Sequence, residues 1–187
     1  MEQIYKSTRS NNIQASPKQA VLKGIADDGG LFVFDGLDQI QIDLNKICSH
    51  SYLENARYIL SGLLPDYTEE ELKECVENAY GNSFASDRVT PLVKVKDQYV
   101  LELFHGPTSA FKDVAPTLLP QLMSKALKGT NEKALILTAT SGDTGKAALS
   151  GFQDVENTGI CVFYPNGKVS NIQYRQMACQ EGGNVNV

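Results

Sequence analysis

The sequence lacks the features that would place it in a membrane or on a nucleic acid. No stretch approaches the run of about 18 apolar residues from which a membrane-spanning helix is built. The formal net charge is -5, and no block of Lys and Arg offers the clustered cations that phosphate backbones select. We therefore predict that the chain binds neither membranes nor nucleic acids.

Marks of secretion and of metal binding are missing as well. Residues 1–6 do not combine a cationic segment with an apolar run, as a secretory signal does, so we expect a cytoplasmic protein. The cysteines form no C-x-x-C pair, and only His50 and His105 could add further ligands. In a reducing cytoplasm we interpret all four as structural thiols that hold no metal: Cys48, Cys75, Cys161 and Cys179.

The N-terminal part, residues 1–90, is typical of a mainly helical domain. Three Ser or Thr residues are each followed three positions later by Glu or Gln, which is the capping-box pattern that opens a helix. Pro17 suits the first turn of the first helix and Gly24 suits its end. Residues 27–30 are typical of a turn. The three capping pairs are Ser16 with Gln19, Ser51 with Glu54 and Thr68 with Glu71.

Residues 91–187 alternate between strand and helix patterns, which predicts an α/β fold with a parallel sheet and crossover helices. Residues 184–187 alternate like the start of a further strand. A domain seldom ends as a core strand begins, so we expect this second domain to continue beyond the chain. The expected strands are 99–104, 134–138 and 160–164, and the expected helices are 111–127, 143–152 and 170–180.

Two segments between a predicted strand and a predicted helix stand where ligands bind in open α/β sheets. The first, residues 105–113, places Lys112 at or just before the first turn of a helix. Helix N-termini favour anions, so a lysine there suggests a function, although on spacing alone a solvated helix lysine is the simpler interpretation. Pro116 and Pro120 predict that this helix begins near Ala115 or is kinked.

The second segment, residues 138–146, is rich in small and hydroxyl-bearing side chains. Its backbone N–H groups and the dipole of the following helix would suit a phosphate or a carboxylate. An equally good interpretation is a tight turn in which Asp143 or Thr144 caps the helix. A nucleotide-binding P-loop is not predicted, because Thr140 stands where its first Gly belongs and Ala147 follows Lys146 in place of Ser or Thr.

Taken together, six stretches in the same order resemble the threonine synthase family. The resemblance covers essentially the whole chain, whereas members of the family run well beyond residue 187. It implies a fold of the tryptophan-synthase β type, in which a helical N-terminal portion (1–90) precedes a pyridoxal 5'-phosphate (PLP) binding α/β domain (91–187), truncated here. The matching stretches are 5–9, 28–31, 103–108, 110–113, 138–145 and 164–170.

The same resemblance implies a reaction and a set of site residues. PLP-dependent conversion of O-phospho-L-homoserine and water to L-threonine and phosphate would make O-phospho-L-homoserine the small-molecule partner. Lys112 would be the catalytic lysine that carries PLP. The early segment 7–9 would reach the substrate phosphate or form a surface turn. Against the substrate carboxylate and the cofactor ring would lie Ser141, Gly142, Asp143, Thr144 and Gly145.

The family's residues for the PLP phosphate and the pyridine nitrogen lie downstream of this chain. We therefore expect the chain alone to bind PLP weakly and not to turn over. One alternative is another PLP lyase of the same fold, such as a serine or threonine dehydratase, although those enzymes usually carry Asn where this chain has Asp143. Another alternative is a non-catalytic interaction domain whose truncated sheet edge self-associates.

Overall fold

The computed structural model describes residues 4–140 and 142–187. They form a mixed α/β structure with a parallel sheet, which confirms the predicted fold class. The chain divides into two compact units, residues 1–76 and 77–187, and helix α4 (Glu69–Tyr80) runs across the division. The predicted domain boundary between residues 90 and 91 stays a prediction.

The first unit contains a small antiparallel sheet that the helical interpretation of this region missed. Its central strand β1 (Tyr5–Ser7) pairs on one side with β2 (Gln14–Ala15) and on the other with β3 (Phe32–Phe34). Strands of two or three residues are too short to show the alternation by which a strand is recognised. The helical elements of this unit are α1 (Pro17–Lys23), η1 (Leu37–Gln39), α2 (Leu44–Ser49) and α3 (Tyr52–Leu63).

All three capping boxes are confirmed. The Ser16 hydroxyl accepts a hydrogen bond from the Gln19 backbone N–H, and the Gln19 side chain accepts one from the Ser16 N–H. Ser51 and Glu54 repeat the arrangement at the start of α3. Gly24 ends α1 with φ +67°, a left-handed value that residues with a side chain rarely adopt.

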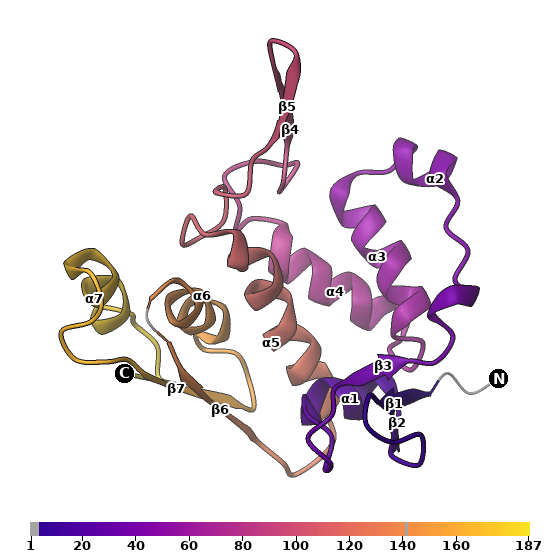
Figure 1. Ribbon diagram of the computed structural model, residues 1–187, viewed down its shortest axis with the longest axis horizontal. Helices are drawn as coiled ribbons and strands as arrows, with labels where there is room; N and C mark the ends of the chain where they lie inside the picture. Colours follow the sequence, from indigo (N-terminus) through magenta and orange to yellow (C-terminus); the bar gives the residue numbers. More distant parts are fainter. Residues whose placement is uncertain (1–3, 141) are drawn as a thin grey trace. The chain divides into compact units, whose positions relative to one another are not determined.

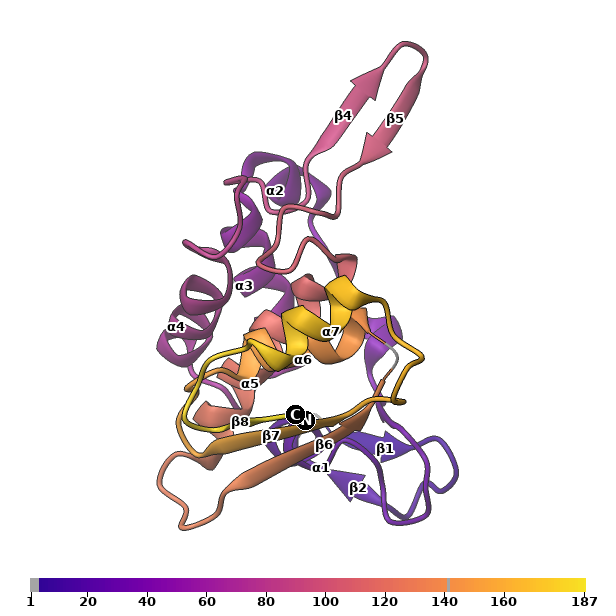
Figure 2. The same cartoon turned by 90° about the vertical axis from the view of Figure 1, so that its left-hand side faces the viewer.

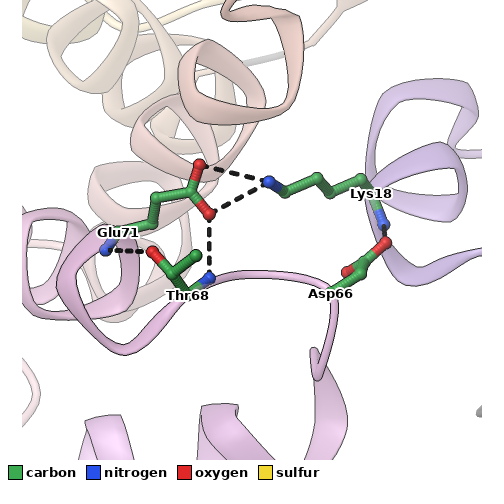
Figure 3. A network of polar contacts seen from close by, with 4 residues as sticks. All are labelled: Lys18, Asp66, Thr68 and Glu71. Carbon is green, nitrogen blue, oxygen red and sulfur yellow. Dashed lines mark hydrogen bonds and ion pairs between the residues drawn. The ribbon is translucent and has the colours of Figure 1, made fainter.

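The third capping box is part of a larger polar network that ties α1 to the start of α4 (Figure 3). Glu71 accepts from the Thr68 backbone N–H at 2.9 Å and from the Lys18 ammonium at 3.0 Å. The Lys18 backbone N–H donates to Asp66 at 2.9 Å, and its ammonium lies 4.8 Å from the centre of the Tyr67 ring. Burial, with the carboxylate of Asp66 as a second cause, raises the pKa of Tyr67. Glu71 therefore both caps the start of α4 and links α4 to α1 through Lys18.

In the second unit, the parallel sheet has the order β6-β7-β8, with β6 in full register against β7. Helices α5, α6 and α7 lie on one side of this sheet (Figures 1 and 2). These elements confirm the predicted strand at 134–138, the strand at 160–164, the helices and the final strand at the chain end. Their bounds are β6 (Ala134–Ala139), β7 (Thr158–Phe163), β8 (Val185–Asn186), α5 (Val114–Leu127), α6 (Asp143–Phe152) and α7 (Asn171–Ala178).

The core of the second unit forms between the helices and the near face of this sheet. Ile160 and Val162 of β7, Leu149 of α6 and Met177 of α7 are buried there. On the opposite face of β6 the alternate residues Leu135 and Leu137 are 65% and 64% exposed. The sheet is therefore covered by the described residues of its own unit on one face only.

The predicted strand at 99–104 is wrong as a member of the parallel sheet. Strand β5 (Gln98–Leu101) instead pairs antiparallel with β4 (Leu92–Val95) in a separate hairpin, which projects from the second unit (Figure 2). Lys96, with φ +55°, stands in its two-residue turn. The apolar run beginning at Tyr99 fits either kind of sheet, and only the pairing with residues 92–95 decides between them.

The helix after the first loop begins where the prolines allow. A short 3-10 turn, η2 (Phe111–Asp113), precedes α5, which starts at Val114 and confirms the expectation of a helix beginning near Ala115. Pro120 lies inside α5, so the backbone carbonyl of Pro116 receives no helical hydrogen bond from it. Helix α6 approaches closely at this carbonyl, because a Cβ added to Gly151 would lie 1.9 Å from the Pro116 oxygen.

Three negative findings hold for the residues that the structure describes. None of the described helices is both long and apolar enough to cross a membrane. No group of three or more His, Cys, Asp or Glu side chains within residues 4–140 and 142–187 is arranged to hold a metal ion. The four cysteines are free thiols, of which Cys75 is buried in α4 and Cys48 and Cys179 are exposed.

Candidate functional site

The two loops singled out in the sequence are joined by one buried contact. The first loop (105–113) lies between the hairpin and α5, and the second (138–146) leads from the carboxyl end of β6 into α6. The Lys146 ammonium, on the first turn of α6, donates a hydrogen bond to the backbone carbonyl of Thr108 in the first loop. The first loop does not follow a strand of the parallel sheet, so the argument that placed it there was wrong, but the two loops do meet.

Lys112 lies in the η2 turn, immediately before α5. Its side chain is half-buried, and its ammonium lies 4.5 Å from the centre of the Phe111 ring. Among the described residues the Lys112 ammonium makes neither a hydrogen bond nor an ion pair. A cation above an aromatic face is stabilised by roughly 0.5–1 kcal/mol, a weak interaction that leaves the amine available for chemistry.

The carboxylate of Asp113, the residue after Lys112, is hydrogen-bonded to Thr108 and Ala110. Its carboxylate is 1% exposed and accepts hydrogen bonds from the Thr108 backbone N–H at 2.8 Å, from the Thr108 hydroxyl and from the Ala110 N–H at 3.4 Å. A Cβ added to Gly106 would lie 2.4 Å from the Cβ of Asp113, so the glycine makes room for this side chain. Asp113 therefore organises the loop and is not the partner of the Lys112 ammonium.

The second loop is organised by the hydroxyl of Thr140, which accepts from the backbone N–H groups of Gly142 and Gly145, both at 3.3 Å. The interpretation of Asp143 or Thr144 as the helix cap is therefore wrong. No acceptor among the described residues binds the backbone N–H groups of these two residues, which begin α6. Binding of an anion at these N–H groups, as the first interpretation of this loop requires, stays a prediction, because Ser141 beside them lies outside the described residues.

Asp143 of this loop contacts helix α7, and the two glycines allow close packing at the start of α6. The Asp143 carboxylate accepts a hydrogen bond from the Gln173 side chain of α7 at 3.1 Å. Gly142 has φ +155°, and Gly145 packs so closely that an added Cβ would lie 2.2 Å from the Thr140 methyl group. Both glycines bring the start of α6 close to its neighbours, which a side chain would prevent.

Lys146 is a residue that the sequence reasoning did not select. Its side chain is 9% exposed, although a lysine is seldom buried without a partner. A signal was available in the sequence, because Lys146 is flanked by the small residues Gly145 and Ala147 and lies three positions before the apolar Leu149. That position predicts an inward-facing side chain rather than a phosphate-binding one.

The early segment Ser7-Thr8-Arg9 lies in the first unit and forms a turn together with residues 27–31. The Ser7 hydroxyl donates to the Asp28 carboxylate at 2.7 Å, and the Arg9 guanidinium donates to the Asp28 carbonyl at 3.0 Å. Hydrogen bonds from the Ser7 hydroxyl and from the Gly30 N–H hold the pKa of Asp28 below its usual value. Thr8 and Arg9 fit the surface-turn interpretation, whereas Ser7 is the buried last residue of β1, and contact with a substrate phosphate stays a prediction.

The comparisons with known proteins that follow all match threonine synthases. Residues 4–80 match the family model described as "Threonine synthase N terminus". A threonine synthase from Eremothecium gossypii is 36% identical over 203 residues, a match that includes 99% of this chain and 40% of that protein. The chain thus spans well under half the length of this relative.

Solved structures agree with these matches. The crystal structure of threonine synthase from yeast superimposes with a TM-score of 0.89 and 34% identity, over 100% of this chain and 40% of that one. The PLP-bound threonine synthase from Brucella melitensis gives a TM-score of 0.85 and 40% identity, over 94% and 38% of the two chains. The fold of this chain is therefore that of the N-terminal portion of these structures.

Proposed function

Because this chain belongs to the threonine synthase family and corresponds to its N-terminal portion, we propose that it supplies the cofactor-attachment lysine of a PLP-dependent threonine synthase. The proposed reaction converts O-phospho-L-homoserine and water to L-threonine and phosphate. This chain matches about two fifths of its relatives, so in this proposal the activity belongs to a longer assembly that includes it.

The observation that carries the proposal is the state of the Lys112 amine. It is half-buried, lies over an aromatic ring and has no hydrogen bond or ion pair among the described residues. Attachment of PLP requires an amine that can lose its proton and reach a carbonyl carbon, which a lysine held in an ion pair does less readily. The residues of this chain fit the cofactor in this respect.

The second loop also fits a PLP enzyme. The N–H groups of Asp143 and Thr144, for which the described residues offer no acceptor, begin a helix, where a carboxylate is favoured by the helix dipole. We assign to this loop the orientation of the substrate carboxylate and of the cofactor ring. Its proposed residues are Ser141, Gly142, Asp143, Thr144 and Gly145.

PLP, when bound, draws electrons from the substrate carbons next to the amino group. Lys112, as a neutral amine, would accept the proton from the substrate Cα and return protons to the neighbouring carbons. The loop at the start of α6 would hold the carboxylate so that the Cα–H bond stays within reach of that amine.

A chimera tests the proposed activity. The chain is joined to the portion of the yeast threonine synthase that it does not match, and phosphate release from O-phospho-L-homoserine is measured. Activity that disappears with Lys112→Ala and persists with Lys128→Ala, a change at an exposed lysine, supports the proposal. A folded chimera that instead forms keto acids from L-serine or L-threonine would favour the dehydratase alternative.

A non-catalytic interaction domain is a second candidate, favoured by apolar residues left exposed on strands of the second unit. Such surfaces mark interaction sites in soluble proteins. Sedimentation over a range of concentrations tests it, since self-association predicts a size that rises with concentration. The exposed residues are Leu92, Val95, Tyr99 and Leu101 of the hairpin and Leu135 and Leu137 of β6.

A cytoplasmic location of the protein stays a prediction.

A further inference from the structure

Two buried residues of opposite charge hold the same residue of the first loop. Lys146 is 9% exposed and Asp113 is 1% exposed. The Lys146 ammonium donates to the Thr108 carbonyl, while the Asp113 carboxylate accepts from the Thr108 backbone N–H and from its hydroxyl. Thr108 is thus bound at its carbonyl, its N–H and its side chain, and we call these three residues the Thr108 clamp.

Burial makes these contacts expensive to lose. Taking an ammonium or a carboxylate out of water is unfavourable unless hydrogen bonds replace those to water. No ion pair joins Lys146 to Asp113 within the described part of the chain, so their contacts with Thr108 provide much of that replacement. The loop can therefore move away from Thr108 only by leaving two buried charges without these partners.

The clamp encloses the segment that bears Lys112. Thr108 lies four residues before Lys112 and Asp113 lies directly after it, so the clamp fixes the chain on both sides of the lysine. Between them Ser109 adopts φ +56°, and the Asp113 N–H donates to the Ala110 carbonyl at 3.0 Å. The backbone at Lys112 has little freedom while the clamp is closed.

We propose that Lys146 is a positioning residue, which acts through Thr108 to fix the backbone of the loop that presents Lys112. The Lys146 side chain comes from α6, so it couples the geometry of the second loop to that of the first. The consequence for cofactor attachment rests on the proposed function of Lys112, whereas the consequence for loop order does not.

Hydrogen–deuterium exchange of the chain tests the loop order without any cofactor. Lys146→Met keeps most of the buried aliphatic stem but removes the donor to Thr108. We expect amides of peptide 105–113 to exchange at least about tenfold faster, because an opening that exposes them loses one buried charge-assisted hydrogen bond. Peptides of β6 and β7 should keep their rates, and Lys133→Met, at an exposed lysine, should change neither.

Two further variants separate positioning from general stability. Lys146→Arg restores a cationic donor and should recover much of the protection of peptide 105–113. Thr108→Val removes the hydroxyl that binds Asp113 and should accelerate the same peptide, which provides a test should Lys146→Met fail to fold. Unchanged exchange in 105–113, or equal acceleration throughout the unit, would overturn the inference.

The link to Lys112 has its own readout. After treatment of the chimera with PLP and reduction, the rate of covalent labelling at Lys112 is measured by peptide mass with the wild-type sequence and with Lys146→Met. A fall of about tenfold in the variant is expected if the clamp positions the amine. Equal labelling in the two chains would contradict the inference, whereas no labelling of Lys112 in the wild type would contradict the proposed function and leave the exchange result to decide the clamp.

Discussion

Two loops of this molecule are built on the same hydrogen-bond pattern but in different surroundings. In the first unit, Asp28 accepts from the Ser7 hydroxyl and from the Gly30 N–H. In the second unit, Asp113 accepts from the Thr108 hydroxyl and from the Thr108 N–H. Asp28 is partly exposed, whereas Asp113 is 1% exposed.

The difference shows that the pattern of bonds does not by itself set their importance. Where water can reach, it replaces a lost acceptor, and the net free energy of the bond is small. Where water is excluded, each donor left without a partner carries its full desolvation cost. The buried loop bears Lys112, so the more buried of the two loops is the one to which we assign chemistry.

The largest expected effect is that of Asp113→Ala. The change leaves the N–H and the hydroxyl of Thr108 buried without their acceptor, so we expect the free energy of unfolding to fall by about 3 kcal/mol. Asp28→Ala, the matched change in the partly exposed loop, should lower it much less. Urea unfolding followed by circular dichroism measures both, and equal losses would remove the distinction between the loops.

The next largest loss of stability is expected from adding a methyl group to the glycine that packs near each aspartate. A Cβ at Gly106 would lie 2.4 Å from the Asp113 Cβ, and one at Gly30 would lie 2.1 Å from the Ser7 hydroxyl oxygen. We expect Gly106→Ala to cost about 2 kcal/mol, because the obstructing atom is close to the backbone and cannot rotate away. Gly30→Ala should cost less, since a hydroxyl can turn. Gly159→Ala, with its nearest neighbour at 3.5 Å, is the control for unfolding midpoints.

The smallest effect is a dependence on pH. The pKa of Asp28 is lower in the folded chain than in the unfolded chain, chiefly because of the Ser7 hydroxyl. The stabilisation is therefore complete above the unfolded value of about 3.9 and is lost as the pH falls through the folded value. The difference in unfolding midpoint between wild type and Ser7→Ala should shrink on acidification. A difference that is constant from neutral to acidic pH would mean that the Ser7–Asp28 contact contributes no charge-dependent stability.

Much of the fold could be predicted because its signals are local. A capping box such as Ser51 with Glu54 needs only four consecutive residues, and the structure bears out all three. The helix predicted at 143–152 agrees with the bounds of α6. Pro116 similarly restricted where α5 could begin.

The errors have a common physical cause, which is that the pattern of a segment does not show which partner its strand or side chain will bind. The apolar run at 99–104 carries no record of whether it pairs with residues 92–95 or with β6. Residues 105–113 give no sign that the Asp113 side chain turns toward Thr108 rather than toward Lys112. Lys146 was judged by a phosphate-binding motif, although its burial depends on the loop 38 residues away. In each case the deciding contact lies outside the local pattern.

The measurement that tests the central claim most directly is a map of covalent labelling over all lysines of the chain. The chimera with the remainder of the yeast threonine synthase is incubated with PLP, reduced with borohydride and digested, and the label on each lysine of this chain is quantified by mass spectrometry. We predict that Lys112 is labelled well above exposed lysines such as Lys128 and Lys133, and that Lys112→Ala removes this excess label alone. Label distributed among the exposed lysines, with none in excess at Lys112, would contradict the assignment of Lys112 as the cofactor lysine.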